Sequence, residues 1–171
     1  RIVKLASNEN PKGPSGKVLS AVREVLTEAS RYPDGNGFSL KTALAKKLAV
    51  ATAQITLGNG SNDVLEIIAR TFISEQCEVI FSEYAFAVYP IVTQAVGAQA
   101  VISKASAGGE YPCYGHDLSA MLRLVNNKTK VVFIANPNNP TGTFLTTSQL
   151  YGFLAELPEH VICVLDEADR K

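Results

Sequence analysis

Three stretches of the sequence carry polar residues at positions that suit ligand binding. The first is the turn Gly58-Asn59-Gly60-Ser61-Asn62, the second is residues 136–142 (Asn-Pro-Asn-Asn-Pro-Thr-Gly), and the third is Asp166. The second and third each follow five apolar residues, a pattern typical of a buried strand. If those strands are parallel, all three stretches lie at the carboxyl edge of one sheet, where ligands bind in α/β proteins.

The glycine-rich turn precedes a helical pattern, so its free backbone amides and the helix dipole could hold a phosphate group. The Ser61 hydroxyl could add a hydrogen bond to that group. An ordinary helix start fits the same residues, and the carboxylates of Asp63 and Glu66 would oppose an anion if they faced it. The phosphate site and the plain helix start are therefore both open at this point.

The two strand ends indicate further chemistry. Asp166 places a carboxylate at the mouth of a core strand, where desolvation favours a cation, a metal or a protonated ring nitrogen as partner. An internal salt bridge is the alternative. The two prolines of residues 136–142 would fix the local backbone, as in a binding loop or a stiff surface turn. Phe86 and Tyr84 could cover a flat ring, or they could pack in the core.

Several other kinds of site are disfavoured. The end of the last strand, residues 164–169, resembles the Mg²⁺-binding strand end of nucleotide-driven helicases, but the phosphate loop G-x-x-x-x-G-K-[ST] is missing around Gly16-Lys17. His116 and His160 have no partners at metal-ligand spacing, so no metal site is predicted and both are expected to be structural or exposed. With 16 basic and 16 acidic residues, the chain offers no field for nucleic acid or an anionic membrane.

Hydrophobic periodicity predicts alternating helices and strands around these stretches. Helices are expected to begin near Ser15, Ser39, Asn62, Tyr89, Asp117 and Thr146. Strands are expected at residues 55–57, 79–81, 100–102, 131–135 and 161–165. Repeated alternation predicts a three-layer α/β/α fold with a mainly parallel sheet and helices on both faces. Residues 1–37 are expected to form an arm and a first helix, and residues 38–171 the main domain.

Composition sets the cellular setting that we expect. Cys77, Cys113 and Cys163 are odd in number and lack Cys-x-x-Cys spacing, which indicates reduced thiols, Cys163 in the core. No apolar stretch approaches the ~20 residues of a spanning helix, and the first residues lack the apolar segment of a signal peptide. We therefore expect a soluble, cytoplasmic protein.

Five motifs, in this order, resemble those of the fold-type I pyridoxal-phosphate aminotransferases, and most closely the histidinol-phosphate aminotransferase subfamily. They lie at residues 4–11 (Lys-Leu-Ala-Ser-Asn-Glu-Asn-Pro), 31–34 (Arg-Tyr-Pro-Asp), 57–63, 136–142 and 165–168 (Leu-Asp-Glu-Ala). The resemblance covers nearly the whole chain. It implies that residues 38–171 are the N-terminal part of the large domain that binds pyridoxal 5'-phosphate.

The resemblance also implies a role for individual residues. The cofactor phosphate would be held by Gly60, Ser61 and Asn62. Phe86 would stack on the pyridine ring, Asn139 would hydrogen-bond the phenolic oxygen, and Asp166 would pair with the protonated ring nitrogen. Tyr32 would reach the cofactor phosphate of the other subunit, which implies a homodimer. Asn8 and Asn10 would border the substrate.

Two departures from the family pattern qualify these expectations. Asp169 stands where the family has a tyrosine that donates to the same ring oxygen, and a carboxylate there would repel that oxygen. The family's Schiff-base lysine lies further along than Lys171, so we expect the chain to be an N-terminal piece that is inactive on its own.

For the parent protein, the resemblance implies amino transfer between a phosphorylated amino-acid-like substrate and a 2-oxo acid, namely histidinol phosphate and 2-oxoglutarate in histidine biosynthesis. Three alternatives stay open: another class I/II aminotransferase, a phospho-amino-acid decarboxylase of the same fold, and a non-catalytic fragment.

Overall fold

The structure, a computed structural model, describes residues 9–168. The chain divides into two compact units between residues 55 and 56. The boundary keeps the second helix with the first, whereas the sequence predicts a division after residue 37. The elements of the first unit are α1 (Gly16–Val25), a 3₁₀ turn (Leu26–Glu28), α2 (Phe38–Leu48) and a second 3₁₀ turn (Thr52–Gln54).

The first unit consists of helices with exposed apolar faces. Ser15 caps α1 as predicted, because its hydroxyl accepts a hydrogen bond from the Val18 amide at 3.4 Å. Neither α1 nor α2 has a buried side chain. The amphipathic pattern therefore predicted the helix correctly, but its apolar stripe covers no core within the described part of this unit.

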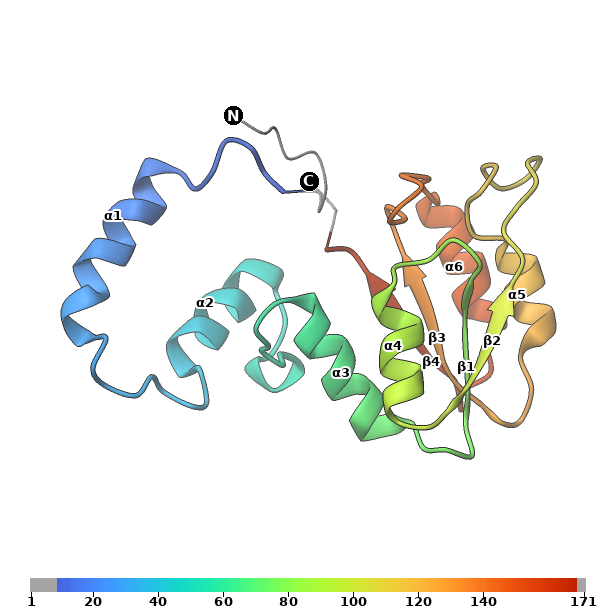
Figure 1. Cartoon of the computed structure of the whole chain (residues 1–171), viewed down its shortest axis with the longest axis horizontal. Helices are drawn as coiled ribbons and strands as arrows, with labels where there is room; N and C mark the ends of the chain where they lie inside the picture. Colours follow the sequence, from blue (N-terminus) through green and yellow to red (C-terminus); the bar gives the residue numbers. More distant parts are fainter. Residues whose placement is uncertain (1–8, 169–171) are drawn as a thin grey trace. The chain divides into compact units, whose positions relative to one another are not determined.

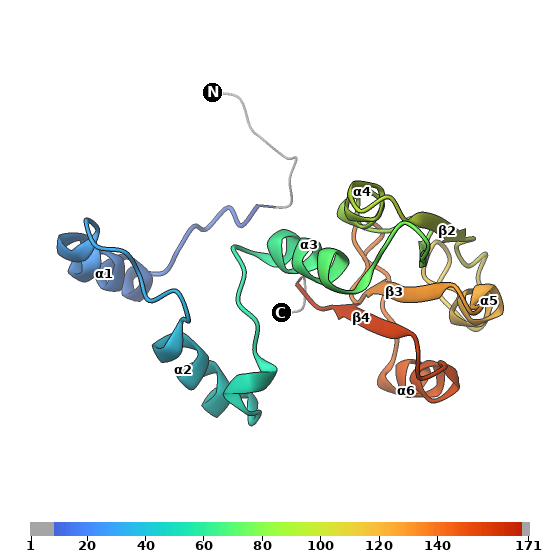
Figure 2. The ribbon, with the colours of Figure 1, turned by 90° about the horizontal axis from the view of Figure 1, so that it is seen from below.

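The second unit is a four-stranded parallel sheet with helices on both faces (Figures 1 and 2). Its strands, in spatial order, are β2 (Gln99–Ser103), β1 (Glu78–Ser82), β3 (Thr129–Ala135) and β4 (Ile162–Asp166). Its helices are α3 (Ser61–Phe72), α4 (Val88–Ala95), α5 (Leu118–Leu124) and α6 (Thr147–Glu156). The predicted three-layer α/β/α architecture is confirmed.

Strand β3 is central and buried on both faces. Val131 and Phe133 pack in the cluster formed with α3 and α4, while Val132 and Ile134 pack in the cluster formed with α5 and α6. All four side chains are fully buried. Alternating side chains thus bind both helix layers to one strand, which explains the continuous apolar run in the sequence.

Local sequence patterns set several element boundaries. Asp117 caps α5 by accepting the Ala120 amide at 2.8 Å, and Thr146 and Gln149 form the predicted capping box of α6. The strand predicted at residues 55–57 is wrong, because this segment has no strand partner among the described residues and follows a 3₁₀ turn in extended coil. A run of three residues was too short a pattern to decide strand pairing.

The cysteines are free thiols, and Cys163 packs half-buried against the α5 and α6 cluster. Burial raises the pKa of the Cys163 thiol to about 11, which keeps it protonated and unreactive at neutral pH. Within residues 9–168, no helix has the length and apolar character needed to cross a bilayer.

The loop after β3 is closed by one buried side chain, Asn136. Its amide nitrogen donates to the Leu145 carbonyl at 3.0 Å, and its amide oxygen accepts from the Leu145 backbone nitrogen at 2.8 Å. We call this pair of hydrogen bonds the Asn136–Leu145 bridge. The Asn136 backbone nitrogen also donates to the Asp166 carbonyl at 2.9 Å, so the same residue joins the loop to the end of β4.

A second buried polar residue, His116, supports the end of β3 from the α5 side. Its Nε2 lies 2.9 Å from the Ala135 carbonyl and must be the donor, since a carbonyl only accepts. Nδ1 is buried without a partner among the described residues. Burial lowers the pKa of His116 more than the bond to Ala135 raises it, so the folded protein favours the neutral imidazole. The sequence expectation of a structural histidine is confirmed.

We expect Asn136→Ala to lower the free energy of unfolding by about 2–4 kcal/mol, because it leaves the buried amide and carbonyl of Leu145 unpaired. Chemical denaturation with two probes would measure this change. The control is Asn127→Ala, which removes an exposed asparagine before β3 and should alter stability by less than about 0.5 kcal/mol. Equal effects of the two substitutions would contradict the bridge.

We also expect stability to fall as the pH drops below 6.5, the ordinary pKa of histidine. In that range unfolded His116 takes up a proton while folded His116, with its lowered pKa, resists it, so the unfolded state binds more protons. The contribution is at most about 1.4 kcal/mol per pH unit.

Denaturation between pH 5 and 8 would test this expectation. His116→Gln should flatten the dependence, and His160→Gln, which leaves His116 in place, should preserve it. An unchanged slope in His116→Gln would reject the assignment.

Candidate functional site

A small pocket of about 100 Å³ lies at the carboxyl edge of the sheet. The pocket is lined by residues from the start of α3, the segment between β1 and α4, the loop after β3 and the end of β4. Its lining residues are Ser61, Phe86, Ala135, Pro137, Asn139, Asp166 and Ala168. Four of the residues singled out in the sequence, far apart along the chain, thus meet in one place.

The start of α3 is shaped by two glycines. A Cβ at Gly58 would lie 2.8 Å from Cγ2 of Val64, so only glycine fits there without a shift. Gly60 precedes the helix with φ of +89°, a conformation that L side chains rarely adopt. No side chain caps α3, so its first amides stay available to an anion, and Ser61 stands beside them in the pocket.

The two carboxylates that could oppose an anion are engaged elsewhere. Asp63 Oδ2 accepts a hydrogen bond from the Asn59 amide at 2.9 Å, which closes the glycine-rich turn. Glu66 pairs with Arg70 one helical turn later at 2.8 Å, on an exposed part of α3. Because Glu66 is paired with Arg70, its charge no longer argues strongly against an anion at the turn. The negative charge of Asp63 remains near the turn.

Asp166 is held by two donors from the protein. Its Oδ2 accepts the Tyr89 hydroxyl at 2.9 Å, and its Oδ1 accepts the Ala168 amide at 3.0 Å. Within residues 9–168, no cationic side chain forms an ion pair with it, so the alternative of an internal salt bridge finds no support there. A half-buried carboxylate without a countercharge suits a cationic ligand group.

A group of three aromatic rings meets this carboxylate through the Tyr89 hydroxyl. Phe86 lies edge-on to Tyr89 with ring centroids 5.8 Å apart, and Tyr89 stacks on Phe133 at 4.7 Å. Phe86 is half-buried and lines the pocket, as a ring-covering residue would. Tyr84 does not line it and instead pairs with Tyr114 at 5.7 Å.

The loop after β3 presents Asn139 to the pocket. Its neighbour Asn138 is buried, and the Asn138 side-chain amide donates to the Tyr84 carbonyl and to the Thr141 hydroxyl, both at 2.7 Å. The Asn138 backbone nitrogen also donates to the Thr143 carbonyl at 2.8 Å. Asn139 itself forms no side-chain hydrogen bond with the described residues, so its amide is available to a ligand.

The remaining predicted residues are not part of this pocket. Gly60 and Asn62 flank Ser61 but do not line the pocket, and both are exposed. Tyr32 and Asn10 belong to the first unit, where both are exposed. Asn8 and Asp169 lie outside the described residues.

Sequence reasoning missed the part played by Tyr89. The sequence placed it only near the start of a helix, and in the structure it is fully buried. The partner of its hydroxyl, Asp166, is 77 residues away, and only the fold brings the two together.

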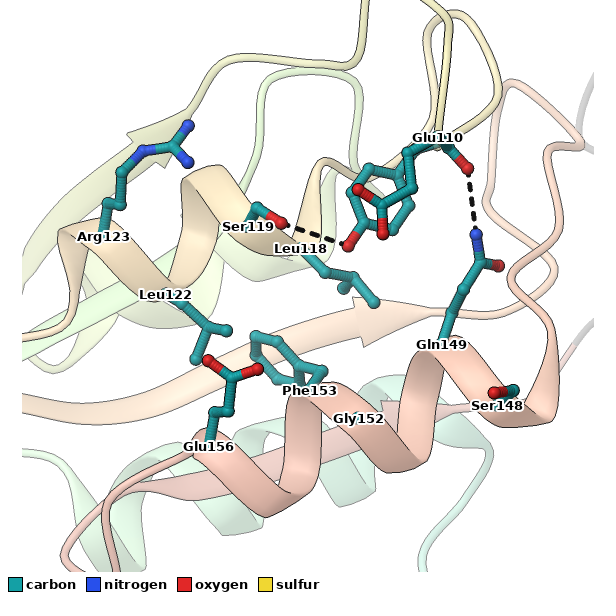
Figure 3. Close-up of a pocket in the computed structure, with 11 residues that line it drawn as sticks. Glu110, Leu118, Ser119, Leu122, Arg123, Ser148, Gln149, Gly152, Phe153 and Glu156 are labelled. Carbon is teal, nitrogen blue, oxygen red and sulfur yellow. Dashed lines mark hydrogen bonds between the residues drawn. The ribbon is translucent and has the colours of Figure 1, made fainter.

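A larger groove of about 470 Å³ lies on the other face of the sheet, between α5 and α6 (Figure 3). Leu118, Leu122 and Phe153 form its apolar floor, and Glu110 and Glu156 lie at its rim. The hydroxyls of Tyr111 and Ser119 lie 3.3 Å apart, so both are paired. None of the residues singled out for ligand binding lies in this groove, and the smaller pocket is the better candidate.

Comparison with known proteins identifies the family of the chain. The family model described as aminotransferase class I and II matches residues 1–168. Two curated relatives are histidinol-phosphate aminotransferase 2 of Methylococcus capsulatus, 61% identical, and histidinol-phosphate aminotransferase 1 of Idiomarina loihiensis, 60% identical. Each alignment covers 98% of this chain but only 45% and 44% of the relatives, so the chain spans less than half their length.

The fold has a matching counterpart among solved structures. The crystal structure of histidinol-phosphate aminotransferase from Sinorhizobium meliloti in complex with pyridoxal 5'-phosphate superposes with a TM-score of 0.87 at 29% identity. The superposition covers 95% of this chain and 43% of that one. Since the family match runs through nearly every residue of the sequence, the chain belongs to the aminotransferase class I and II family.

Proposed function

We propose that the protein containing this chain transfers an amino group between histidinol phosphate and 2-oxoglutarate with pyridoxal 5'-phosphate as cofactor. The observation that carries the proposal is the meeting of Ser61, Phe86, Asn139 and Asp166 in one pocket. Two relatives named histidinol-phosphate aminotransferase, at 61% and 60% identity, support the choice of substrate.

The groups present in the pocket fit the proposed cofactor one by one. A phosphate suits the uncapped N-terminus of α3, and a phenolic oxygen suits the amide of Asn139. A protonated ring nitrogen suits the Asp166 carboxylate, which has no ion-pair partner within residues 9–168. The ring of Phe86 offers an apolar face. A flat phosphorylated heterocycle is one ligand that would match all of these donors, the acceptor and the ring.

Each residue then has a proposed task. Gly60, Ser61 and Asn62 hold the phosphate, Phe86 covers the ring, Asn139 donates to the ring oxygen, and Asp166 keeps the ring nitrogen protonated. When bound, pyridoxal phosphate supplies an electron-withdrawing ring that stabilises negative charge at the substrate carbon. Asp166 serves that chemistry by facing the positive charge of the ring nitrogen in a partly desolvated place.

The rest of the site is proposed to come from outside the described pocket. Its volume of about 100 Å³ is below the roughly 300–1,000 Å³ of typical ligand pockets. We propose that the sheet described here is the N-terminal part of the large cofactor domain, and that the Schiff-base lysine comes from the further length present in the relatives. Tyr32 is proposed to reach the cofactor phosphate of a second subunit, in a homodimer, and Asn8 and Asn10 to border the substrate.

We also propose a cytoplasmic location. The described cysteines are free thiols, Cys113 is exposed, and such thiols persist in reducing compartments.

The proposed reaction predicts a clear substrate profile. The full-length protein should convert histidinol phosphate and 2-oxoglutarate into imidazole-acetol phosphate and glutamate, which a coupled glutamate assay would follow. Histidinol without its phosphate should react at least about tenfold less well, because the site would lose a charged contact. Activity only with other amino donors would assign a different aminotransferase, and release of CO₂ without amino transfer would assign a decarboxylase.

Removing the Asp166 carboxylate should weaken cofactor binding. We expect Asp166→Ala to raise the dissociation constant of pyridoxal 5'-phosphate at least about 30-fold, since the ring nitrogen loses its countercharge. Titration followed by absorbance would measure it. Glu110→Gln removes a carboxylate from the larger groove and should change the constant less than about twofold. The reverse ranking would move the cofactor site to that groove.

A further inference from the structure

Tyr89 combines complete burial with a polar contact at the edge of the proposed site. The residue has no exposed surface, although a tyrosine hydroxyl buried without a partner is costly. The hydroxyl instead donates to Asp166 Oδ2 at 2.9 Å, joining α4 to the end of β4. The hydrogen bond therefore satisfies a buried donor and holds one oxygen of a carboxylate that the proposed function needs.

The ring of Tyr89 is itself held by the core. It lies parallel to Phe133, with 7° between the ring planes and centroids 4.7 Å apart, and Phe133 is fully buried in the central strand. On another side it meets Phe86 edge-on at 87°, with centroids 5.8 Å apart. One fully buried tyrosine thus contacts two side chains that line the pocket, Phe86 through its ring and Asp166 through its hydroxyl.

The carboxylate of Asp166 has its orientation set at both oxygens. The Ala168 amide donates to Oδ1 at 3.0 Å while Tyr89 donates to Oδ2. The Ala168 amide belongs to the chain just after β4, so it moves with Asp166 itself. Tyr89 is the donor that ties the carboxylate to a different element of the core.

We propose that Tyr89 is a positioning residue that fixes the Asp166 carboxylate and the Phe86 ring relative to each other, so that one flat cationic ring can meet both. This inference rests on the proposed function, since it names the residue that arranges the two ring contacts. A charge-assisted hydrogen bond requires good direction as well as distance, and small displacements of such groups weaken binding.

The test is a double-mutant cycle on the full-length protein, read out as the dissociation constant of pyridoxal 5'-phosphate. Tyr89→Phe keeps both ring contacts and removes the hydroxyl, and we expect it to weaken binding about tenfold. In an Asp166→Ala background the same substitution should change binding less than about twofold, because its partner is already gone. Tyr89→Leu also removes the ring contact to Phe86 and should weaken binding further than Tyr89→Phe.

A matched control separates positioning from general stability. Tyr111→Phe removes the hydroxyl of another buried tyrosine, paired with Ser119 on the opposite face of the sheet, and should leave cofactor binding within about twofold. Equal losses from Tyr89→Phe with and without the Asp166 carboxylate would overturn the inference. So would unchanged binding in Tyr89→Phe while the unaltered protein binds the cofactor. Failure of the unaltered protein to bind would reject the proposed function and this inference with it.

Discussion

The arrangement of the sheet edge depends on a carboxylate that has no countercharge among the described residues. Asp166 ends β4 half-buried, and the protein provides it with the Tyr89 hydroxyl and the Ala168 amide in place of a cation. These two neutral donors orient the Asp166 carboxylate but leave its negative charge uncompensated. A cationic group in the pocket could compensate that charge. The ring of Phe86 and the amide of Asn139 line the same pocket as this carboxylate.

Rigid support behind the pocket comes from the central strand. β3 contacts both helix layers, His116 reaches its last carbonyl from the α5 side, and the Asn136–Leu145 bridge closes the loop that follows. Each of these contacts is buried, so moving the loop would break hydrogen bonds that water cannot replace at once. These buried contacts therefore help to place the side chains on the loop and at the strand ends.

Much of this fold could be predicted from the sequence, and the exceptions have physical causes. Hydrophobic periodicity and the caps at Asp117 and Thr146 are local signals, so the helix starts and the strand at residues 131–135 were predicted to within two residues. The short run at residues 55–57 lacked a strand partner, which no local pattern can supply. Because parallel strands end at the same edge of a sheet, the sequence alone could place Ser61, Asn139 and Asp166 together. The Tyr89 hydrogen bond could not be foreseen, because a buried tyrosine gives no sign of which distant group its hydroxyl meets.

The tight approach at Gly58 has an evolutionary consequence. A methyl group there would press on both the side chain and the backbone nitrogen of Val64, at 2.8 and 3.1 Å. A smaller residue at position 64 would relieve only the contact with the side chain. The contact with the backbone nitrogen would remain, so a single compensating substitution does not make room for a larger residue at position 58. Lineages that inherit this turn are expected to retain the glycine while the exposed face of α3 diverges freely around it.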